Sequence, residues 1–330
     1  MHTVKPNHPQ RLDFSAQDEP VASETKTFTL AQLSDPHLTT LEGVPARVLL
    51  NKRLLGYLSW RRRRRHEHRR EILDALVDDL LSLHPDHIAV TGDLTHLGLP
   101  QEFRQARSWL EGLGPPDEVT VIPGNHDATV PSAWRDTFAA WSPYMLSDGS
   151  DAPIHDVAQV FPSLRVRDGV ALIGVSTAVP TPPLLATGRV GRSQLSRLAR
   201  LLEQTAQDHL YRIVMLHHPP LPGAVTWRKR LVDSAGLGTV LNHSAPDLIL
   251  HGHAHRTSVH EMVCDGRKVP VIGIPSASAV GGRPGRRARY HLYRISRRLQ
   301  GWTTRVEVRA YAPDTARFVA EQEFELLAGY

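Results

Sequence analysis

The chain has a single cysteine, Cys264, and no apolar run of about 18 residues that could span a bilayer as a helix. One thiol cannot form an internal disulfide, which is typical of a protein from a reducing compartment. Residues 1–20 are polar and contain prolines, without the apolar stretch of a signal peptide. These absences predict a cytoplasmic protein.

Acidic residues are nearly missing from two basic segments. Residues 46–70 hold ten Lys or Arg and one acid, Glu67, while residues 283–298 hold seven Arg and no acid. The net charge of +5 therefore conceals a remainder with 22 basic and 33 acidic residues. Such concentrated positive charge indicates that an anionic partner or substrate approaches these segments.

The remaining sequence alternates short apolar runs with longer helical patterns, which is typical of an α/β protein. The length and the hydrophobic content of 41% predict one large domain over residues 27–330, after a flexible tail at residues 1–26. After Cys264 the alternation is all-β. Helices are expected over residues 71–83, 100–112 and 192–206 and before residue 242, and strands over residues 27–34, 87–92, 119–124, 170–177, 211–217 and 247–252.

Five of these six strands end directly in a polar cluster. In open α/β sheets, ligands bind outside the carboxyl ends of the strands, where loops present side chains from a rigid base. Each cluster alone is also typical of an ordinary loop or helix cap, but all five in order at strand ends indicate one shared site. The clusters are SDPH (34–37), TGDLTH (91–96), PGNHD (123–127), LHHPP (216–220) and HGHAH (251–255).

The side chains of these clusters indicate a metal site. Imidazole nitrogens mixed with carboxylate and amide oxygens suit Mn, Fe, Zn or Co better than Ca or Mg. The clusters offer no thiolate, and they hold too many ligands for one tetrahedral ion. We therefore expect two divalent ions that share one carboxylate, for which Asp93 is the natural bridge. Two ions about 3.5–4 Å apart can hold the attacking and leaving oxygens of a phosphoryl displacement.

Jointly, the five clusters resemble the motif blocks of the calcineurin-like metallophosphoesterases, over about residues 27–280. The resemblance implies a metal-dependent phosphoric ester hydrolase with a four-layer α/β/β/α fold, in which helices flank two mixed sheets. It also implies the metal ligands: Asp35, His37 and His255 for one ion, Asn125, His217 and His253 for the other, and Asp93 as the bridge.

One further motif histidine, His126, is expected to contact the phosphate or protonate the leaving group rather than bind metal. An imidazole with a pKa of about 6.5 can deliver a proton at neutral pH. Asp127 is expected to orient the ring of His126 as its carboxylate partner. The expected nucleophile is a hydroxide that bridges the two ions, because coordination lowers the pKa of water to about 7.

Other histidines are not expected at the metals. Strand alternation should turn His218 away from the site. His251 is expected to pack behind the ligands, and His96 to lie beside them at most. Four more are expected on the surface of helices or loops: His66, His68, His84 and His87.

The motifs do not name a substrate, because this family includes diesterases, monoesterases, nucleases, protein phosphatases and nucleotide-lipid pyrophosphatases. Arg256, directly after GHAH, and the compact length resemble the bacterial branch that acts on cyclic nucleotides. The PSASA segment (275–279) resembles a small-residue loop of small bacterial members. We expect hydrolysis of a small phosphodiester, such as a cyclic nucleotide or glycerophosphodiester. A non-catalytic metal-binding scaffold is the alternative from another class, although no expected ligand is missing.

The basic insertion at residues 42–70 departs from the cyclic nucleotide branch. Its apolar and aromatic side chains interleave with Arg, which is typical of an interfacial amphipathic helix. The insertion is expected to overhang the site. Its residues from Arg47 to Arg65 are expected to contact an anionic membrane surface or a lipid-linked phosphate. This arrangement resembles the nucleotide-lipid pyrophosphatases of the same family. A solvated helix packed on the core is the plain alternative. A nuclease is less favoured, because only Tyr57 and Trp60 could stack on bases.

Overall fold

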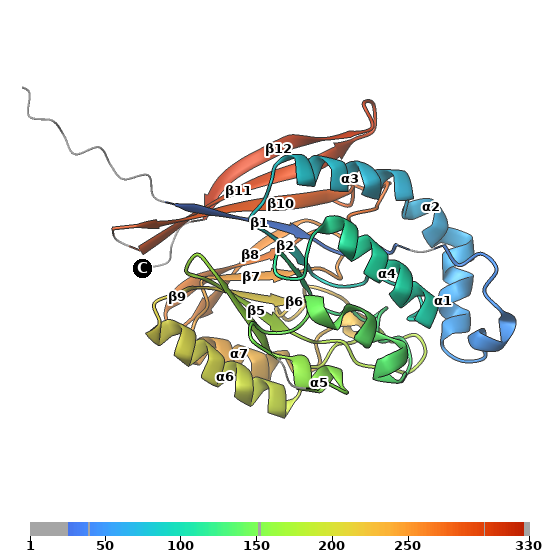
Figure 1. Cartoon of the computed structure of the whole chain (residues 1–330), viewed down its shortest axis with the longest axis horizontal. Coiled ribbons are helices and arrows are strands. Elements are labelled where there is room, and N and C mark those ends of the chain that lie inside the picture. Colours follow the sequence, from blue (N-terminus) through green and yellow to red (C-terminus); the bar gives the residue numbers. More distant parts are fainter. Residues whose placement is uncertain (1–25, 39, 151–152, 300, 327–330) are drawn as a thin grey trace, which may run out of the picture.

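A computed structural model describes residues 26–38, 40–150, 153–299 and 301–326. The tail expected at residues 1–26 lies outside these residues, apart from Lys26. The described strands form two six-stranded sheets, and helices cover their outer faces (Figure 1). The four-layer α/β/β/α sandwich implied by the sequence is therefore confirmed.

The first sheet has the strand order β12-β11-β10-β1-β2-β3. It is mixed, because β1 pairs in parallel with β2 and antiparallel with β10. Its strands are β1 (Thr27–Leu33), β2 (His87–Val90), β3 (Val119–Val121), β10 (Arg289–Arg298), β11 (Gly301–Ala312) and β12 (Arg317–Leu326).

The second sheet has the order β4-β5-β6-β7-β9-β8. Its four central strands are parallel, and an antiparallel strand closes each edge. Its strands are β4 (Ser163–Arg167), β5 (Val170–Val175), β6 (Tyr211–Leu216), β7 (Leu248–His251), β8 (Ser258–Cys264) and β9 (Arg267–Gly273).

Two helices cover the outer face of each sheet, α3 and α4 on the first, α6 and α7 on the second (Figure 1). They are α3 (Arg70–Ser82), α4 (Pro100–Leu113), α6 (Arg192–Gln207) and α7 (Ser234–His243). Shorter helical turns are α5 (Val157–Val160) and the 3₁₀ segments Trp134–Asp136, Phe138–Tyr144 and Trp227–Lys229. Within the described residues, none of the helices has the length and apolar character needed to cross a membrane.

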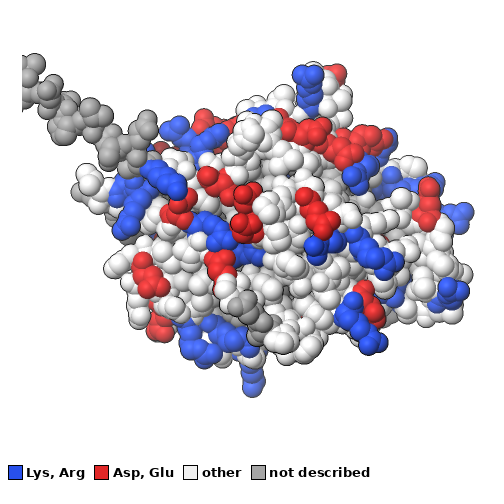
Figure 2. All heavy atoms as spheres, viewed as in Figure 1, with Lys and Arg blue, Asp and Glu red and all other residues white. Residues whose placement is uncertain are grey.

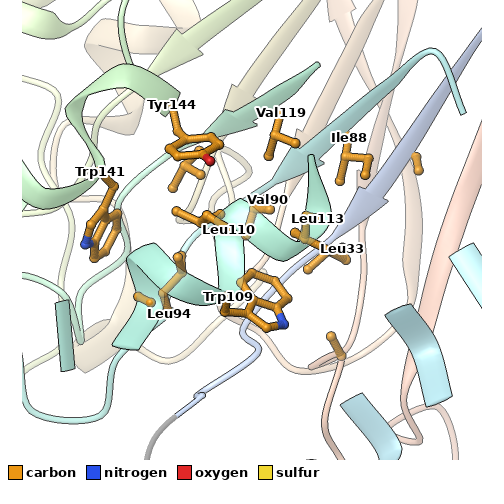
Figure 3. Packing of buried hydrophobic residues seen from close by; sticks show 14 of the residues in the cluster. Leu33, Ile88, Val90, Leu94, Trp109, Leu110, Leu113, Val119, Trp141 and Tyr144 are labelled. Carbon is orange, nitrogen blue, oxygen red and sulfur yellow. The ribbon is translucent and has the colours of Figure 1, made fainter. Parts of the chain in front are cut away.

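Alternation along the strands divides the apolar side chains between the layers. On β1, Phe28 and Leu30 face the second sheet, while Ala31 and Leu33 face the helices. Figure 3 shows the outer layer, where Leu33 and Ile88 lie on the strands opposite α4. Full burial of one such side chain contributes about 1.5–3 kcal/mol of transfer free energy. The packed layers therefore hold the strand ends, and the loops that follow them, in fixed positions.

All six expected early strands are present, but each ends one to three residues before its expected end. The missing residues are those that turn into the polar loops. The sequence did not predict β4 or β8. Both are edge strands, and β8 (SVHEMVC) exposes most of its residues, so the apolar alternation that marks a buried strand is weak there.

The basic insertion is helical. It begins with a 3₁₀ turn (Ala46–Leu49), followed by α1 (Arg53–Ser59), a π-helical turn (Trp60–Arg64) and α2 (Arg65–Glu67). Trp60 is buried against Leu97 and Leu99, and Arg53 donates to the backbone oxygens of residues 97 and 98. The insertion is thus fastened to the loop after β2.

The second basic segment is β10 with the turn before it. Two of its arginines pair with acids of the next strands of the sheet: Arg289 with Glu321 of β12 at 2.6 Å and Arg294 with Glu307 of β11 at 2.8 Å. Acids of β11 and β12 therefore offset part of the positive charge of the second basic segment. The insertion has few acids, and Figure 2 shows blue side chains on the rim where α1 and α2 lie in Figure 1.

Candidate metal centre

The five polar clusters meet at one edge of the sandwich. The backbone N–H of Asp35 donates to Gly92 at 2.9 Å, and that of Gly252 donates to His217 at 3.1 Å. The first of these bonds joins the loops after β1 and β2, and the second joins the loops after β6 and β7. The carboxyl ends of the strands thereby present their side chains to a common space.

The expected metal ligands form two groups that share Asp93. Within each group, one nitrogen or oxygen atom per side chain lies within 4.8 Å of every other. Asn125 joins the second group, because its Oδ1 lies 3.3 Å from Nε2 of His217. The first group is Asp35, His37, Asp93 and His255, and the second is Asp93, His217 and His253.

The donors in these groups fit divalent ions. Nε2 of His37 and Oδ1 of Asp35 are buried without a hydrogen-bond partner among the described residues. Buried polar atoms are otherwise nearly always paired. Nε2 of His255 approaches that Asp35 oxygen to 3.0 Å, and Nε2 of His217 lies 3.3 Å from Oδ2 of Asp93. Imidazole and carboxylate lone pairs thus converge where a cation would balance them.

Backbone carbonyls orient three of these rings. Nδ1 of His37 donates to Thr95 at 3.1 Å, and Nδ1 of His217 donates to Thr91 at 2.7 Å. His253 uses Nε2 instead, which donates to the carbonyl of Lys229 at 3.0 Å. Each bond leaves the other ring nitrogen with its lone pair for a metal. The expected metal-facing atoms are therefore Nε2 of His37 and His217 and Nδ1 of His253.

The backbone is strained at most of these positions. Non-glycine residues adopt positive φ rarely, because Cβ crowds the backbone there. Eleven described non-glycine residues have positive φ, and five of them are expected ligands. Such strain gathers at functional sites, where the surrounding structure holds it in place. The five are Asp35, His37, Asp93, His253 and His255.

Two motif glycines allow the loops to approach. A Cβ atom on Gly124 would collide with the carboxylate of Asp93, and one on Gly252 would collide with the hydroxyl of Ser34 and the Asp35 carboxylate. The glycines of GNHD and GHAH are therefore required by close packing around the ligands.

Asp127 has a different role from the one expected. Its carboxylate accepts from the backbone N–H groups of Asp93 (3.0 Å), Thr95 (2.9 Å) and Gly124 (2.8 Å) and from the Thr95 hydroxyl. None of its described hydrogen bonds reaches the ring of His126. Asp127 lies one residue beyond His126 in a tight turn, where its side chain points into the protein and ties two loops together.

His126 is oriented by other groups. Its Nδ1 donates to the carbonyl of His96 at 2.6 Å. Its Nε2 accepts from Nη1 of Arg64 at 2.7 Å. The backbone N–H of His126 also donates to Asp93 Oδ1 at 2.7 Å. The ring therefore presents Nε2 toward the cavity, beside the shared carboxylate and a guanidinium from the insertion.

The buried carboxylates and imidazoles of the two groups shift one another's pKa values. Burial opposes the charged imidazolium of His217, but Asp93 and Asp35 outweigh it and raise the pKa of His217 to about 9. Burial likewise opposes the charged form of Asp35, yet His255 holds the pKa of Asp35 below its usual range. Burial and the neighbouring Asp93 raise the pKa of Asp127. Positive charge is thus favoured between Asp35 and Asp93.

Two histidines expected on the surface are not there. His87 is fully buried on β2 and bonds the hydroxyl of Thr120 at 2.8 Å. His68 lies beside the metal ligands, with its ring 4.4 Å from that of His37. His66 and His84 are exposed, as expected. The sequence around His68 and His87 did not indicate their contacts with His37 and Thr120, because those partners are distant in the chain.

The other excluded histidines lie behind or beside the ligands. His218 uses Nδ1 on the hydroxyl of Thr177 (2.8 Å) and Nε2 on the carbonyl of Ala186 (3.2 Å). His251 is buried, and its Nδ1 bonds the carbonyl of the next residue. His96 stacks on His37 with ring centroids 5.0 Å apart. His251 and His96 therefore lie where they were expected. His218 is not turned away from the ligands, because its ring centroid is 4.3 Å from that of His253, although both of its nitrogens bond to other groups.

The ligands open into a cavity of about 600 Å³. The insertion forms one wall, with Arg63, Arg64 and Glu67, so it does overhang the site. Burial and the nearby Arg64 lower the pKa of Lys229, which also lines the cavity. The cavity therefore suits an anion. Its basic lining residues are Arg63, Arg64, Lys229, Arg256 and Arg286.

Residues 28–257 match the calcineurin-like phosphoesterase family. The match covers more than half of the chain, so the chain belongs to this family, as its five motif clusters predicted.

Curated bacterial relatives carry a narrower description. A cAMP/cGMP dual specificity phosphodiesterase of Mycobacterium tuberculosis is 34% identical over 180 residues, covering 52% of this chain and 49% of that protein. A probable cyclic nucleotide phosphodiesterase of Rhodococcus erythropolis is 32% identical, covering 56% of each chain. One from Synechococcus is 26% identical, covering 73% of this chain and 78% of that protein. The chain thus spans about half the length of the first two relatives.

Solved structures share the fold at low identity. A dimetal phosphatase from Danio rerio has a TM-score of 0.60 at 13% identity, covering 91% of this chain and 99% of the other. A purple acid phosphatase from yellow lupin seeds has a TM-score of 0.56 at 10% identity, covering 92% and 54%. These similarities agree with the layered architecture of the two sheets.

Proposed function

We propose that the protein is a binuclear metal-dependent phosphodiesterase that hydrolyses a small diester such as a cyclic nucleotide. The observation that carries this proposal is the pair of ligand groups sharing Asp93. Shared carboxylates suit two ions at the short separation that diester hydrolysis uses. The relatives described as cyclic nucleotide phosphodiesterases support the substrate class.

The side chains around the ligand groups have separable tasks in this proposal. Two bound divalent ions would supply a hydroxide nucleophile at neutral pH and offset the phosphate charge. Arg64 and Lys229 line the cavity and would attract and orient the phosphate. His126, held by the carbonyl of His96, carries its ring proton on Nδ1 and accepts from Arg64 through Nε2, so it would orient Arg64 toward the phosphate. To protonate the leaving oxygen, Nε2 would first have to take up a proton from water, which burial and Arg64 oppose because they lower the pKa of His126.

The direct test is hydrolysis by purified protein after removal and return of metal. Bis(p-nitrophenyl) phosphate and cyclic AMP are the substrates, with Mn²⁺, Fe²⁺, Zn²⁺ and Co²⁺ added separately. We expect turnover of both diesters only after a divalent ion is restored. No metal-dependent turnover of either diester would refute the proposal.

Arg64 should be the arginine of the Arg61–Arg65 run that matters for catalysis. It alone turns inward to His126, whereas Arg62 is exposed and does not line the cavity. We expect Arg64→Ala to lower kcat/KM for cyclic AMP by about 10²-fold, the usual cost of one lost donor to a phosphate or oxyanion. Arg62→Ala is the matched control and should stay within about 2-fold of the wild type. Equal losses in both variants would mean that the run acts only through its net charge.

A second candidate is hydrolysis of a lipid-linked phosphate at a membrane surface. Three leucines of the insertion are exposed, namely Leu50 (82%), Leu54 (44%) and Leu55 (43%), in a segment rich in Arg and Lys. Exposed apolar groups beside basic ones favour binding to anionic lipid. Trp60, in contrast, is buried and belongs to the core of the insertion.

Vesicle sedimentation tests this second candidate. We expect the wild type to bind vesicles with anionic phosphatidylglycerol, and the triple variant Leu50→Gln, Leu54→Gln, Leu55→Gln to bind at least about 10-fold less, because apolar insertion is lost. The control is Val263→Gln, which changes an exposed apolar residue of β8. No binding of the wild type, or equal binding of the triple variant, would remove the membrane from the proposal.

A further inference from the structure

His68 is the residue at which the basic insertion returns to the sheet. The helix of α2 ends at Glu67, and His68 is extended, with φ −99° and ψ 112°. Its ring centroid lies 4.4 Å from that of His37 and 5.6 Å from that of His255. Two expected ligands of the first metal group are thus its ring neighbours.

The backbone on both sides of His68 is fixed to the PSASA segment. His68 forms a β-bridge with Ala279, the N–H of Arg69 donates to the carbonyl of Ser278 at 2.9 Å, and the N–H of Val280 donates to the carbonyl of Glu67 at 2.9 Å. The backbone of His68 is therefore held in position by these hydrogen bonds, which fixes the point from which its side chain extends.

Two serines of the PSASA segment hold the ring. Nδ1 of His68 lies 3.0 Å from the hydroxyl of Ser278 and 3.2 Å from that of Ser276. The Ser276 hydroxyl donates its proton to the carbonyl of Asp35 at 2.6 Å. Its oxygen can therefore only accept a hydrogen bond from His68. When the ring proton is on Nδ1, His68 donates to the serine oxygens and a lone pair is left on Nε2. Histidines that ligate metals commonly have this arrangement.

The ring also lies where an ion could reach it. His68 lines the cavity together with Asp93 and His255. His37, His68 and His255 form a group of their own, in which one ligand atom per side chain lies within 4.8 Å of the others. The insertion therefore adds an imidazole to the donors of the first metal group.

We propose that His68 is a metal ligand supplied by the insertion, in addition to Asp35, His37, Asp93 and His255. This inference rests on the proposed binuclear site. A third imidazole makes the first site richer in nitrogen, which favours Zn²⁺, Co²⁺ or Fe²⁺ over Mn²⁺. It also joins the insertion to the metal, so the wall that carries Arg64 is held in place when the ion is bound.

The test compares His68→Asn with His66→Asn. Asparagine at position 68 can keep the bond to the serines through its amide N–H but has no atom at the place of Nε2. His66 is exposed on the same insertion, so it is the matched control. Metal-free forms are titrated with Zn²⁺ against a competing chelator, and bound ions are counted by elemental analysis.

We expect His66→Asn to bind two ions, each with the same affinity as in the wild type. His68→Asn should bind one of the two ions at least about 10-fold more weakly than the wild type does. Even the loss of a group that only hydrogen-bonds to a metal ligand lowers metal affinity about 10- to 100-fold. Wild-type affinity at both sites in His68→Asn would overturn the inference and leave the proposed function intact. Failure of the wild type itself to bind two ions would instead overturn the proposed function.

A measurement on the wild type covers the case in which His68→Asn does not fold. In the Co²⁺-loaded protein, the ring N–H of each coordinated imidazole gives a shifted, exchangeable proton NMR signal. Five such signals are expected when His68 coordinates together with His37, His217, His253 and His255. Four signals would contradict coordination by His68.

Discussion

Asp93→Asn is expected to lower kcat/KM for bis(p-nitrophenyl) phosphate by at least about 10³-fold. Asp93 is the carboxylate common to both ligand groups, so its loss affects both ions. The charge stabilisation supplied by a catalytic metal is worth several kcal/mol, and each 1.36 kcal/mol changes the rate about tenfold. Steady-state kinetics at saturating metal, with elemental analysis of the same samples, measure both consequences.

The same substitution should not unfold the metal-free protein. Asp93 is 1% exposed, and its charge raises the pKa of the buried Asp127 carboxyl. Asparagine removes that repulsion and can still accept the N–H of His126, but it also removes the pairing of Asp93 with the buried imidazole of His217. Because these two effects have opposite signs, we expect the metal-free variant to remain folded with a thermal midpoint close to that of the metal-free wild type. Asp78→Asn, at an exposed site on α3, is the control and should leave kinetics unchanged. Activity within 10-fold of the wild type in Asp93→Asn would contradict the shared role of Asp93.

His126→Gln should lower activity on both diesters by a similar factor. The ring of His126 orients Arg64 toward the phosphate, and that contact does not depend on the leaving group. We expect a loss of about 10²-fold in kcat/KM for cyclic AMP and for bis(p-nitrophenyl) phosphate, the usual cost of one lost donor to a phosphate. Metal content should be unchanged, because neither ligand group includes His126.

Two other outcomes would assign His126 differently. A loss of about 10²- to 10⁴-fold in kcat for cyclic AMP, with less than about 10-fold for bis(p-nitrophenyl) phosphate, would mean that Nε2 protonates the leaving oxygen, because a basic alkoxide needs that proton and p-nitrophenolate does not. Unchanged kinetics for both substrates would exclude any catalytic role for the ring.

The convergence of the expected ligands could be predicted from sequence because each of them lies within a few residues of a strand end. Asp35 and His37 follow β1, and His253 and His255 follow β7. Parallel strands bring such positions to the same edge, so order along the chain determines proximity. The positive φ angles of these residues, in contrast, could not be predicted from the residue types alone.

Arg64 and His68 could not be predicted in the same way. In a run of five arginines, the sequence does not say which one turns inward, and here a π-helical turn ends at Arg64. His68 depends on pairing with Ala279, more than 200 residues away in the chain. The error for Asp127 has a local cause, since adjacency to His126 does not mean that the two side chains point the same way.

The central claim is that two ions, held by groups that share Asp93, make this site catalytic. Metal-free protein should be titrated with Mn²⁺ or Zn²⁺ while hydrolysis of bis(p-nitrophenyl) phosphate is followed at protein concentrations above the dissociation constant. We expect activity to reach its plateau at two equivalents of metal per chain. A plateau at one equivalent, or full activity in the metal-free protein, would contradict the claim.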